Sequence, residues 1–205
     1  MISKIARQEC LAMYPKFPWR GYDEVEDEDL FFHPRVFSHY ILTLNSKSFK
    51  GNASLMGRQL KALIVNLGFD SLIFLGDVSI SWRYQNNTFN PVREALNYLI
   101  ENKVGKQFDG ALEVETNELP IFIKHLSWLV RCNASLPYFY FCDKGQNIMA
   151  SLCKYGNLHI DSINSCTDNF LLASIRKSDF KILNTKECFN RHGKTSAIHK
   201  RQIVL

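Results

Sequence analysis

Three carboxylates in the segment FDGALEVE, residues 108–115, are spaced so that they could bind a metal ion. They are Asp109, Glu113 and Glu115, and in a strand Glu113 and Glu115 would point to the same face. Clustered carboxylates can hold a divalent ion that stabilises phosphoryl charge, so the segment indicates a metal-dependent nuclease as one candidate. The lysine expected two residues after the glutamate is missing, and an ordinary solvated strand face explains the same residues.

A second candidate is a thiol paired with a histidine. Cys142 and its neighbour Asp143 precede Cys153 and His159 in a segment with the pattern of consecutive strands, so a Cys/His pair could form across those strands. A thiol nucleophile needs such a base and an accessible, electropositive setting. A cysteine buried in an apolar strand, which is inert, explains the same pattern.

Short motifs with a known mechanism are absent. The sequence has no GxGxxG, GxxxxGK[ST], GxSxG, HExxH or EF-hand pattern. Its six cysteines include no CxxC pair, which disfavours zinc bound by closely spaced ligands and indicates reduced thiols. His125, beside Trp128 in an apolar segment, is expected to be a core histidine. We therefore expect no cofactor and no metal, and assign no catalytic residue.

The block DEVEDED, residues 23–29, places six carboxylates in seven positions of a chain whose net charge is +5. Without this block the chain would be far more basic, at about +11. Like charges three and four residues apart repel along a helix, and the block lacks the central glycine and terminal glutamate of a calcium-binding EF-hand. With a helix and an EF-hand disfavoured, the block is expected to be an exposed segment. It either only keeps the protein soluble or attracts a basic partner electrostatically.

Aromatic residues flank this block on both sides. Aromatic anchors next to steering charges are typical of protein interfaces. The same aromatics could instead pack the segment onto its own domain. Both interpretations apply to Trp19, Tyr22, Phe31 and Phe32.

Basic residues form two groups that could contact phosphates. A loosely attached basic tail, or residues that only keep the surface soluble, is the preferred explanation of these groups. The groups are Lys47, Lys50, Arg58 and Lys61, and Arg191, Lys194, Lys200 and Arg201.

Hydrophobic periodicity predicts three strand–helix units followed by an antiparallel meander. The units are expected at 38–44 with 52–67, 71–84 with 90–105, and 110–116 with 118–132. The meander strands are expected at 137–143, 148–155 and 158–163, before a helix at 165–175 and a short strand at 179–183. This order predicts a mixed sheet and an α/β or α+β fold.

The 205 residues, 46% of them hydrophobic, suffice for a single domain with a substantial core. We expect an N-terminal arm with the acidic segment at 1–37, the globular domain at 38–185 and a basic C-terminal tail at 186–205. The beginning of the chain lacks the apolar region of a signal peptide, and no window has the roughly 20 apolar residues of a membrane span. A cytoplasmic protein without membrane contact is expected.

A small α/β chain with no catalytic signature, an acidic segment and the meander YFYFCDKGQNIMASLCKYGNLHID resembles the immunity proteins of bacterial contact-dependent growth inhibition and related polymorphic toxin systems. That resemblance implies a protein that binds one cognate toxin domain, often a basic nuclease, and blocks it without chemistry of its own. The overall positive charge departs from the acidic balance of many nuclease inhibitors.

The hypothesis from sequence is a non-enzymatic immunity protein that binds its toxin directly. The alternatives are a metal-dependent nuclease using Asp109, Glu113 and Glu115, and a module that binds nucleic acid. The predicted partner-binding residues are Asp23, Glu24, Glu26, Asp27, Glu28, Asp29, Trp19, Tyr22, Phe31 and Phe32.

Overall fold

The computed structural model describes residues 1–23, 28–78, 80–84, 87–132, 138–185 and 187–193, with the backbone alone for 20–23 and 28–30. The helices are α1 (Arg7–Met13), α2 (Phe49–Asn66), α3 (Asn90–Glu101), α4 (Leu119–Cys132) and α5 (Ser165–Arg176). The strands are β1 (Ile2–Ile5), β2 (Trp19–Asp23), β3 (Glu28–Phe32), β4 (Ser38–Thr43), β5 (Ser71–Gly76), β6 (Ala111–Glu115), β7 (Phe139–Cys142), β8 (Ile148–Leu152), β9 (Leu158–Ser162) and β10 (Lys181–Ile182).

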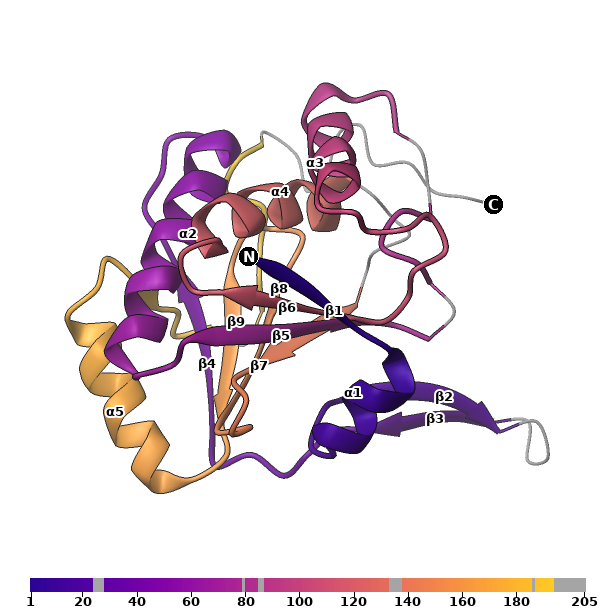
Figure 1. Cartoon of the computed structure of the whole chain (residues 1–205). Helices are drawn as coiled ribbons and strands as arrows, with labels where there is room; N and C mark the ends of the chain where they lie inside the picture. The colour runs from indigo at the N-terminus through magenta and orange to yellow at the C-terminus, as the bar shows by residue number, and fades with distance from the viewer. Residues whose placement is uncertain (24–27, 79, 85–86, 133–137, 186, 194–205) are drawn as a thin grey trace.

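Eight of these strands form one sheet in the order β1-β6-β5-β7-β8-β9-β4-β10, and β2 pairs with β3 separately (Figure 1). The predicted fold class is confirmed: the chain is a single-domain α+β protein in which three strand–helix units precede the meander β7–β8–β9. Neighbouring strands in the sheet are antiparallel, although the strand–helix order predicted a mixed sheet. Two arrangements account for this: the meander separates β4 from β5, and β6 pairs with β5 antiparallel although α3 connects them.

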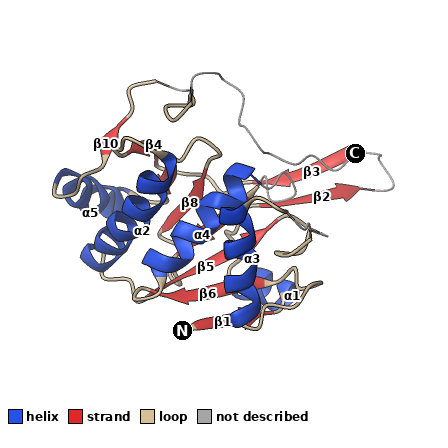
Figure 2. Ribbon diagram, turned by 90° about the horizontal axis from the view of Figure 1, so that it is seen from above, coloured by secondary structure: helices blue, strands red, loops and turns tan. Residues whose placement is uncertain are grey.

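Four helices cover one face of the sheet. Figure 2 shows α5, α2, α4 and α3 side by side across it. The core beneath them includes Phe74 and Phe141 from the strands and Leu60 and Phe122 from the helices, all at most 1% exposed. The apolar helix α4 is largely buried.

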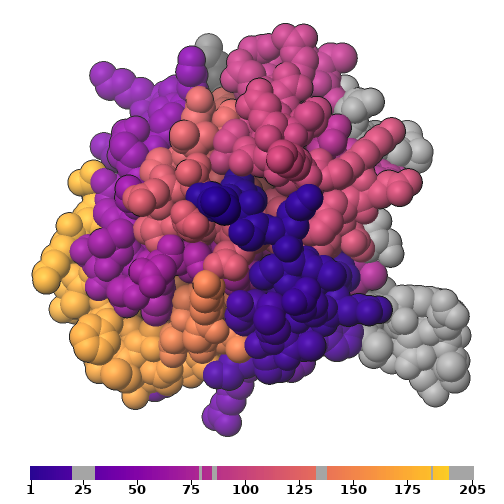
Figure 3. Space-filling model, viewed as in Figure 1, coloured from indigo at the N-terminus to yellow at the C-terminus, as the bar shows by residue number. Residues whose placement is uncertain are grey.

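The opposite face of the sheet is partly covered by α1. Strand alternation directs Leu72 and Phe74 toward the four helices, and Ile73 and Leu75 toward the cluster that holds Cys10 of α1. In Figure 3 the indigo N-terminal residues lie against the orange and pink parts of the surface. Residues 1–23 therefore contribute β1 to the edge of the main sheet and α1 to the second core.

The boundaries of α2 show how local sequence positions the elements. Ser48 caps α2 by accepting a hydrogen bond from the Gly51 amide at 3.1 Å, so the helix begins at Phe49, three residues before the predicted start at position 52. The side chain of Asn52 instead donates to the Gly156 carbonyl at 2.9 Å, which ties α2 to the turn between β8 and β9. Gly68, with φ +77°, follows the helix end as predicted.

None of the helices in the described ranges combines the length and apolarity needed to cross a membrane. In the C-terminal segment, the described residues 187–193 pack on the domain. Arg191 donates from Nη1 to Thr43 Oγ1 at 2.8 Å, and Arg131 donates from Nη2 to Asn190 Oδ1 at 3.4 Å.

Candidate functional sites: an acidic hairpin and a cysteine–histidine cluster

The acidic block lies on a hairpin. Strands β2 and β3 are antiparallel, with Asp23 opposite Glu28 and Tyr22 opposite Asp29. The hairpin reaches away from the main sheet in both Figure 1 and Figure 2, so Asp23, Glu28 and Asp29 lie at its outer end. The predicted site residues Glu24, Glu26 and Asp27 fall outside the described residues, as does the side chain of Tyr22.

Some of the flanking aromatics pack within the chain, and one is exposed as an interface residue would be. Trp19 and Phe32 occupy directly opposed positions, and their rings stack with centroids 6.2 Å apart. Phe31, the neighbour of Phe32 and therefore on the other face of the hairpin, is 55% exposed. Trp19 and Phe32 therefore pack within the hairpin, while Phe31 offers an apolar surface to solvent.

The three carboxylates of the nuclease alternative are each matched by a different cation. Asp109 lies 3.5 Å from Arg7 Nε, Glu113 lies 2.6 Å from Lys144 Nζ, and Glu115 lies 3.0 Å from the N-terminal ammonium of Met1. Arg7 also donates to the Asp109 carbonyl at 2.8 Å, and this bond fastens α1 to the segment that precedes β6. Within the described part of the chain, these carboxylates do not form a group that could share a metal ion.

A cluster of two thiols and an imidazole lies at the end of β8 and β9. His159 in β9 is directly opposite Ser151 in β8, and Cys153, two residues after Ser151, lies on the same face of the sheet. Cys188, from the C-terminal segment, places its Sγ 3.3 Å from His159 Nε2. The ligand atoms of Cys153, His159 and Cys188 all lie within 4.8 Å of one another.

Hydrogen bonds shift the pKa values of the two thiols in opposite directions. The bond with Cys153 lowers the pKa of Cys188 below its ordinary value, although burial opposes this shift. The side chains of His159 and Asn157 hydrogen-bond Cys188 and act in the same direction. The same bond with Cys188, together with burial, raises the pKa of Cys153. The environment therefore favours ionisation of Cys188 over that of Cys153.

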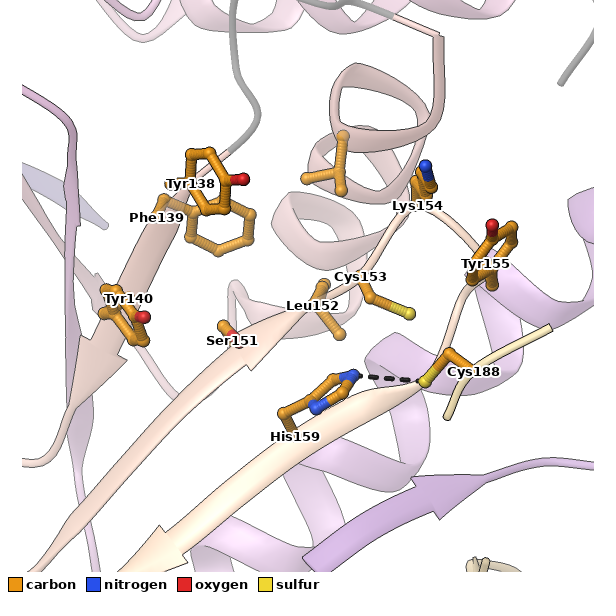
Figure 4. A pocket seen from close by; sticks show the side chains of 11 residues that line it. Tyr138, Phe139, Tyr140, Ser151, Leu152, Cys153, Lys154, Tyr155, His159 and Cys188 are labelled. Atoms are coloured by element: carbon orange, nitrogen blue, oxygen red, sulfur yellow. Dashed lines mark hydrogen bonds between the residues drawn. The ribbon is translucent and has the colours of Figure 1, made fainter. Parts of the chain in front are cut away.

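A cavity of about 380 Å³ opens beside this cluster. All three cluster residues line it, and Figure 4 shows Cys153, His159 and Cys188 converging at one end while Tyr138, Phe139 and Tyr140 lie at the other. The cavity therefore gives a small molecule access to the sulfur and nitrogen atoms.

Polar residues continue from the cluster across the open face of the sheet. The ring of His159 lies 5.8 Å from that of His39, and His39 Nδ1 is hydrogen-bonded to Asp161 Oδ1. His33, which follows β3, lies 3.7 Å from the other oxygen of Asp161. This row connects the cysteine–histidine cluster to the base of the acidic hairpin.

The predicted Cys/His pair forms in part. Cys153 and His159 are brought together, but Cys142 is buried against α1 with its pKa raised by burial, and Asp143 organises a turn. The part played by Cys188 was not predicted, because its contact with His159 joins positions 29 residues apart, with α5 and β10 between them. His125 stacks on Tyr98 at 4.7 Å, and burial lowers its pKa.

The basic groups of the nucleic-acid alternative are partly used within the chain. Lys61 donates to Asn117 at 2.9 Å and Arg191 to Thr43, whereas Lys194, Lys200 and Arg201 lie outside the described residues.

Comparison with protein-family models, with curated proteins and with solved structures found no match for this chain. The two candidate sites therefore have to be judged on their chemistry. The hairpin can attract a basic surface, and the cluster can bind a soft metal ion or present a thiolate.

Proposed function

We propose that this chain is a binding protein that neutralises a toxin domain by covering its active site, as the immunity proteins it resembles do. The observation that carries the proposal is the position of Asp23, Glu28 and Asp29 at the outer end of a hairpin that projects from the sheet. A projecting acidic hairpin can enter a concave basic surface that a flat acidic patch cannot reach.

A nuclease is the toxin class that this hairpin fits best. A nuclease cleft must attract phosphates, and a strand of duplex DNA carries one charge per roughly 3.4 Å of helix axis. The segment 23–29 places six carboxylates in seven residues, so the hairpin carries a dense run of negative charge. Such attraction speeds association and weakens as ionic strength rises.

Phe31 supplies an apolar contact next to these charges. It belongs to the strand that carries Glu28 and Asp29, and more than half of its side chain is exposed. Charges at an interface mainly set the association rate, whereas a desolvated aromatic anchor mainly slows dissociation. The carboxylates and Phe31 therefore have kinetic roles that can be separated by experiment.

The test compares two variants with equal changes in charge. The hairpin variant carries Asp23→Asn, Glu24→Gln, Glu26→Gln, Asp27→Asn, Glu28→Gln and Asp29→Asn. The control variant carries six such changes at exposed positions elsewhere: Glu9→Gln, Asp70→Asn, Glu94→Gln, Glu101→Gln, Asp179→Asn and Glu187→Gln. The partner is the product of the open reading frame next to the gene for this chain, prepared in catalytically inactive form.

Association and dissociation rates are measured across a range of salt concentrations. We expect the hairpin variant to associate at least about 10-fold more slowly at low salt, with the difference closing as salt screens the charges. Phe31→Ala should instead accelerate dissociation. An unchanged rate and salt slope, or an equal loss in the control variant, would remove the hairpin from the mechanism.

A further inference from the structure

The atoms of the cysteine–histidine cluster have the spacing of a metal site. In a tetrahedral zinc site with Zn–S bonds of about 2.3 Å and Zn–N bonds of about 2.0 Å, two sulfurs lie roughly 3.8 Å apart and a sulfur and a nitrogen roughly 3.6 Å apart. Cys188 Sγ lies 3.3 Å from His159 Nε2, and the three ligand atoms fall within 4.8 Å of one another. Shifts of less than about 1 Å would bring all three to bonding distance.

The surrounding structure holds two of these ligands in a fixed relation. The turn from Cys153 to Asn157 is closed by Cys153 N–H bonding to the Asn157 carbonyl at 3.0 Å and Gly156 N–H bonding to the Cys153 carbonyl at 2.9 Å. Gly156 has φ +85°, and a Cβ there would lie 2.5 Å from Asn52 Nδ2. The close backbone turn required by Cys153 and His159 therefore depends on a glycine at position 156.

The third ligand is held by the contacts of the C-terminal segment. Arg191, three residues after Cys188, bonds Thr43 in β4, and Asn190 accepts from Arg131 in α4. The buried side chain of Asn157, 2% exposed, also hydrogen-bonds Cys188. The three ligands thus come from three segments that the domain itself positions.

We propose that Cys153, His159 and Cys188 bind a Zn²⁺ ion whose fourth coordination position opens into the adjacent cavity. Two thiolates and an imidazole suit zinc, whereas magnesium and calcium prefer oxygen ligands. Three protein ligands with an open position are the arrangement of reactive rather than structural zinc sites. The cavity of about 380 Å³ would admit water or a small anion to that position. The site does not depend on the toxin-binding function.

Metal binding is tested on the full chain in the presence of a phosphine reductant. Zn²⁺ is titrated in competition with a chromophoric chelator, and Co²⁺ is then substituted to record absorption. We expect one ion per chain and intense thiolate-to-cobalt charge-transfer bands. Added azide, as a probe of the fourth position, should shift the cobalt ligand-field bands.

Substitutions identify the ligands. Cys153→Ser, His159→Ala and Cys188→Ser should each weaken zinc binding at least about 100-fold, because each removes one of three protein ligands. Cys166→Ser, an exposed cysteine in α5, should leave the affinity unchanged. Cys188→His should retain zinc while weakening the thiolate-to-cobalt bands, which separates loss of a ligand from loss of folding.

Three results would overturn the site. The first is the absence of a stoichiometric ion, and the second is a cobalt spectrum without thiolate bands. The third concerns metal-free chain purified without reductant, in which two fewer thiols are titrated than the six cysteines present. These two thiols would return on reduction, and only when Cys153 and Cys188 are both present. That result would assign the pair to a disulfide.

Discussion

Gly57 in α2 lies against Pro120 in the first turn of α4, so closely that a Cβ at position 57 would stand 2.5 Å from the Pro120 carbonyl oxygen and 2.8 Å from its Cα. The atoms it would meet are backbone atoms, which cannot rotate away. The close contact of α2 and α4 over the sheet therefore requires glycine at this position.

Replacing Gly57 with alanine should lower the free energy of unfolding by about 2 kcal/mol, the typical cost of overpacking a core. Helix propensity alone predicts the opposite sign, because alanine in a helix interior is favoured over glycine by about 1 kcal/mol. Urea denaturation of Gly57→Ala measures the balance.

Gly51→Ala in the same helix is the matched control. A Cβ there would meet the side-chain hydroxyl groups of Ser46 at 2.8 Å and Ser48 at 3.3 Å rather than backbone atoms, so the loss of stability should be smaller than for Gly57→Ala. If Gly57→Ala were as stable as Gly51→Ala, the close packing of α2 on α4 would be contradicted.

Asp143 organises the turn between β7 and β8. Its side chain is buried, and its two carboxylate oxygens accept from the backbone amides of Gly145, Asn147 and Ile148 at 3.0, 2.7 and 2.9 Å. Asp143→Ala should lower the free energy of unfolding by about 3 kcal/mol, because three amides lose a charged acceptor. Asp143→Asn keeps one acceptor oxygen and should lose less in the same thermal or urea experiment. Unchanged stability in Asp143→Ala would show that the amides do not depend on the carboxylate.

Glu113 should make stability depend on pH in the acidic range. Burial alone would raise its pKa, but hydrogen bonds from Lys144 and Ser71 and the charge of Lys144 bring the pKa below its ordinary value of 4.5. Folding therefore stabilises the carboxylate form. This contribution is present above pH 4.5 and is lost as pH falls through the lower pKa of the folded state.

Glu113→Gln should cost about 1 kcal/mol at pH 7, a modest figure because Lys144 is largely solvated. The difference from the unsubstituted chain should shrink below pH 4.5 and vanish at lower pH. Urea denaturation at a series of pH values measures it, with Glu101→Gln on the exposed side of α3 as control. A difference that stayed constant with pH would rule out the ionised pair as its source.

Much of the fold could be predicted, because its central elements carry strong local signals. The run SLIFLG predicted β5, and the apolar periodicity ending at Gly68 predicted α2. The hairpin β2–β3 could not be predicted, since acidic residues have low strand propensity and the acidic block includes the end of β2 at Asp23 and the start of β3 at Glu28. The position of β1 in the sheet could not be predicted either, because ISKI is only four residues long and pairs with a strand more than 100 positions later.

The candidate sites were predictable to different degrees. Charge density alone identified the acidic segment, whereas the cysteine–histidine cluster needed three-dimensional information. A turn of the type CKYGN indicates that Cys153 and His159 approach each other, but no periodicity connects either to Cys188. That contact depends on how residues 187–193 return over the sheet, which side-chain contacts such as Arg191 with Thr43 determine.

The pairing of β4 with β9 constrains how the chain is made. Ser38 lies opposite Ser162, 124 positions later. A ribosome adding on the order of 10 residues per second would leave β4 without its neighbour for roughly ten seconds. During that interval the backbone N–H and C=O groups of β4 lack their partner strands β9 and β10. The sheet therefore closes only after most of the chain has been synthesised, and an unpaired strand edge is prone to association until then.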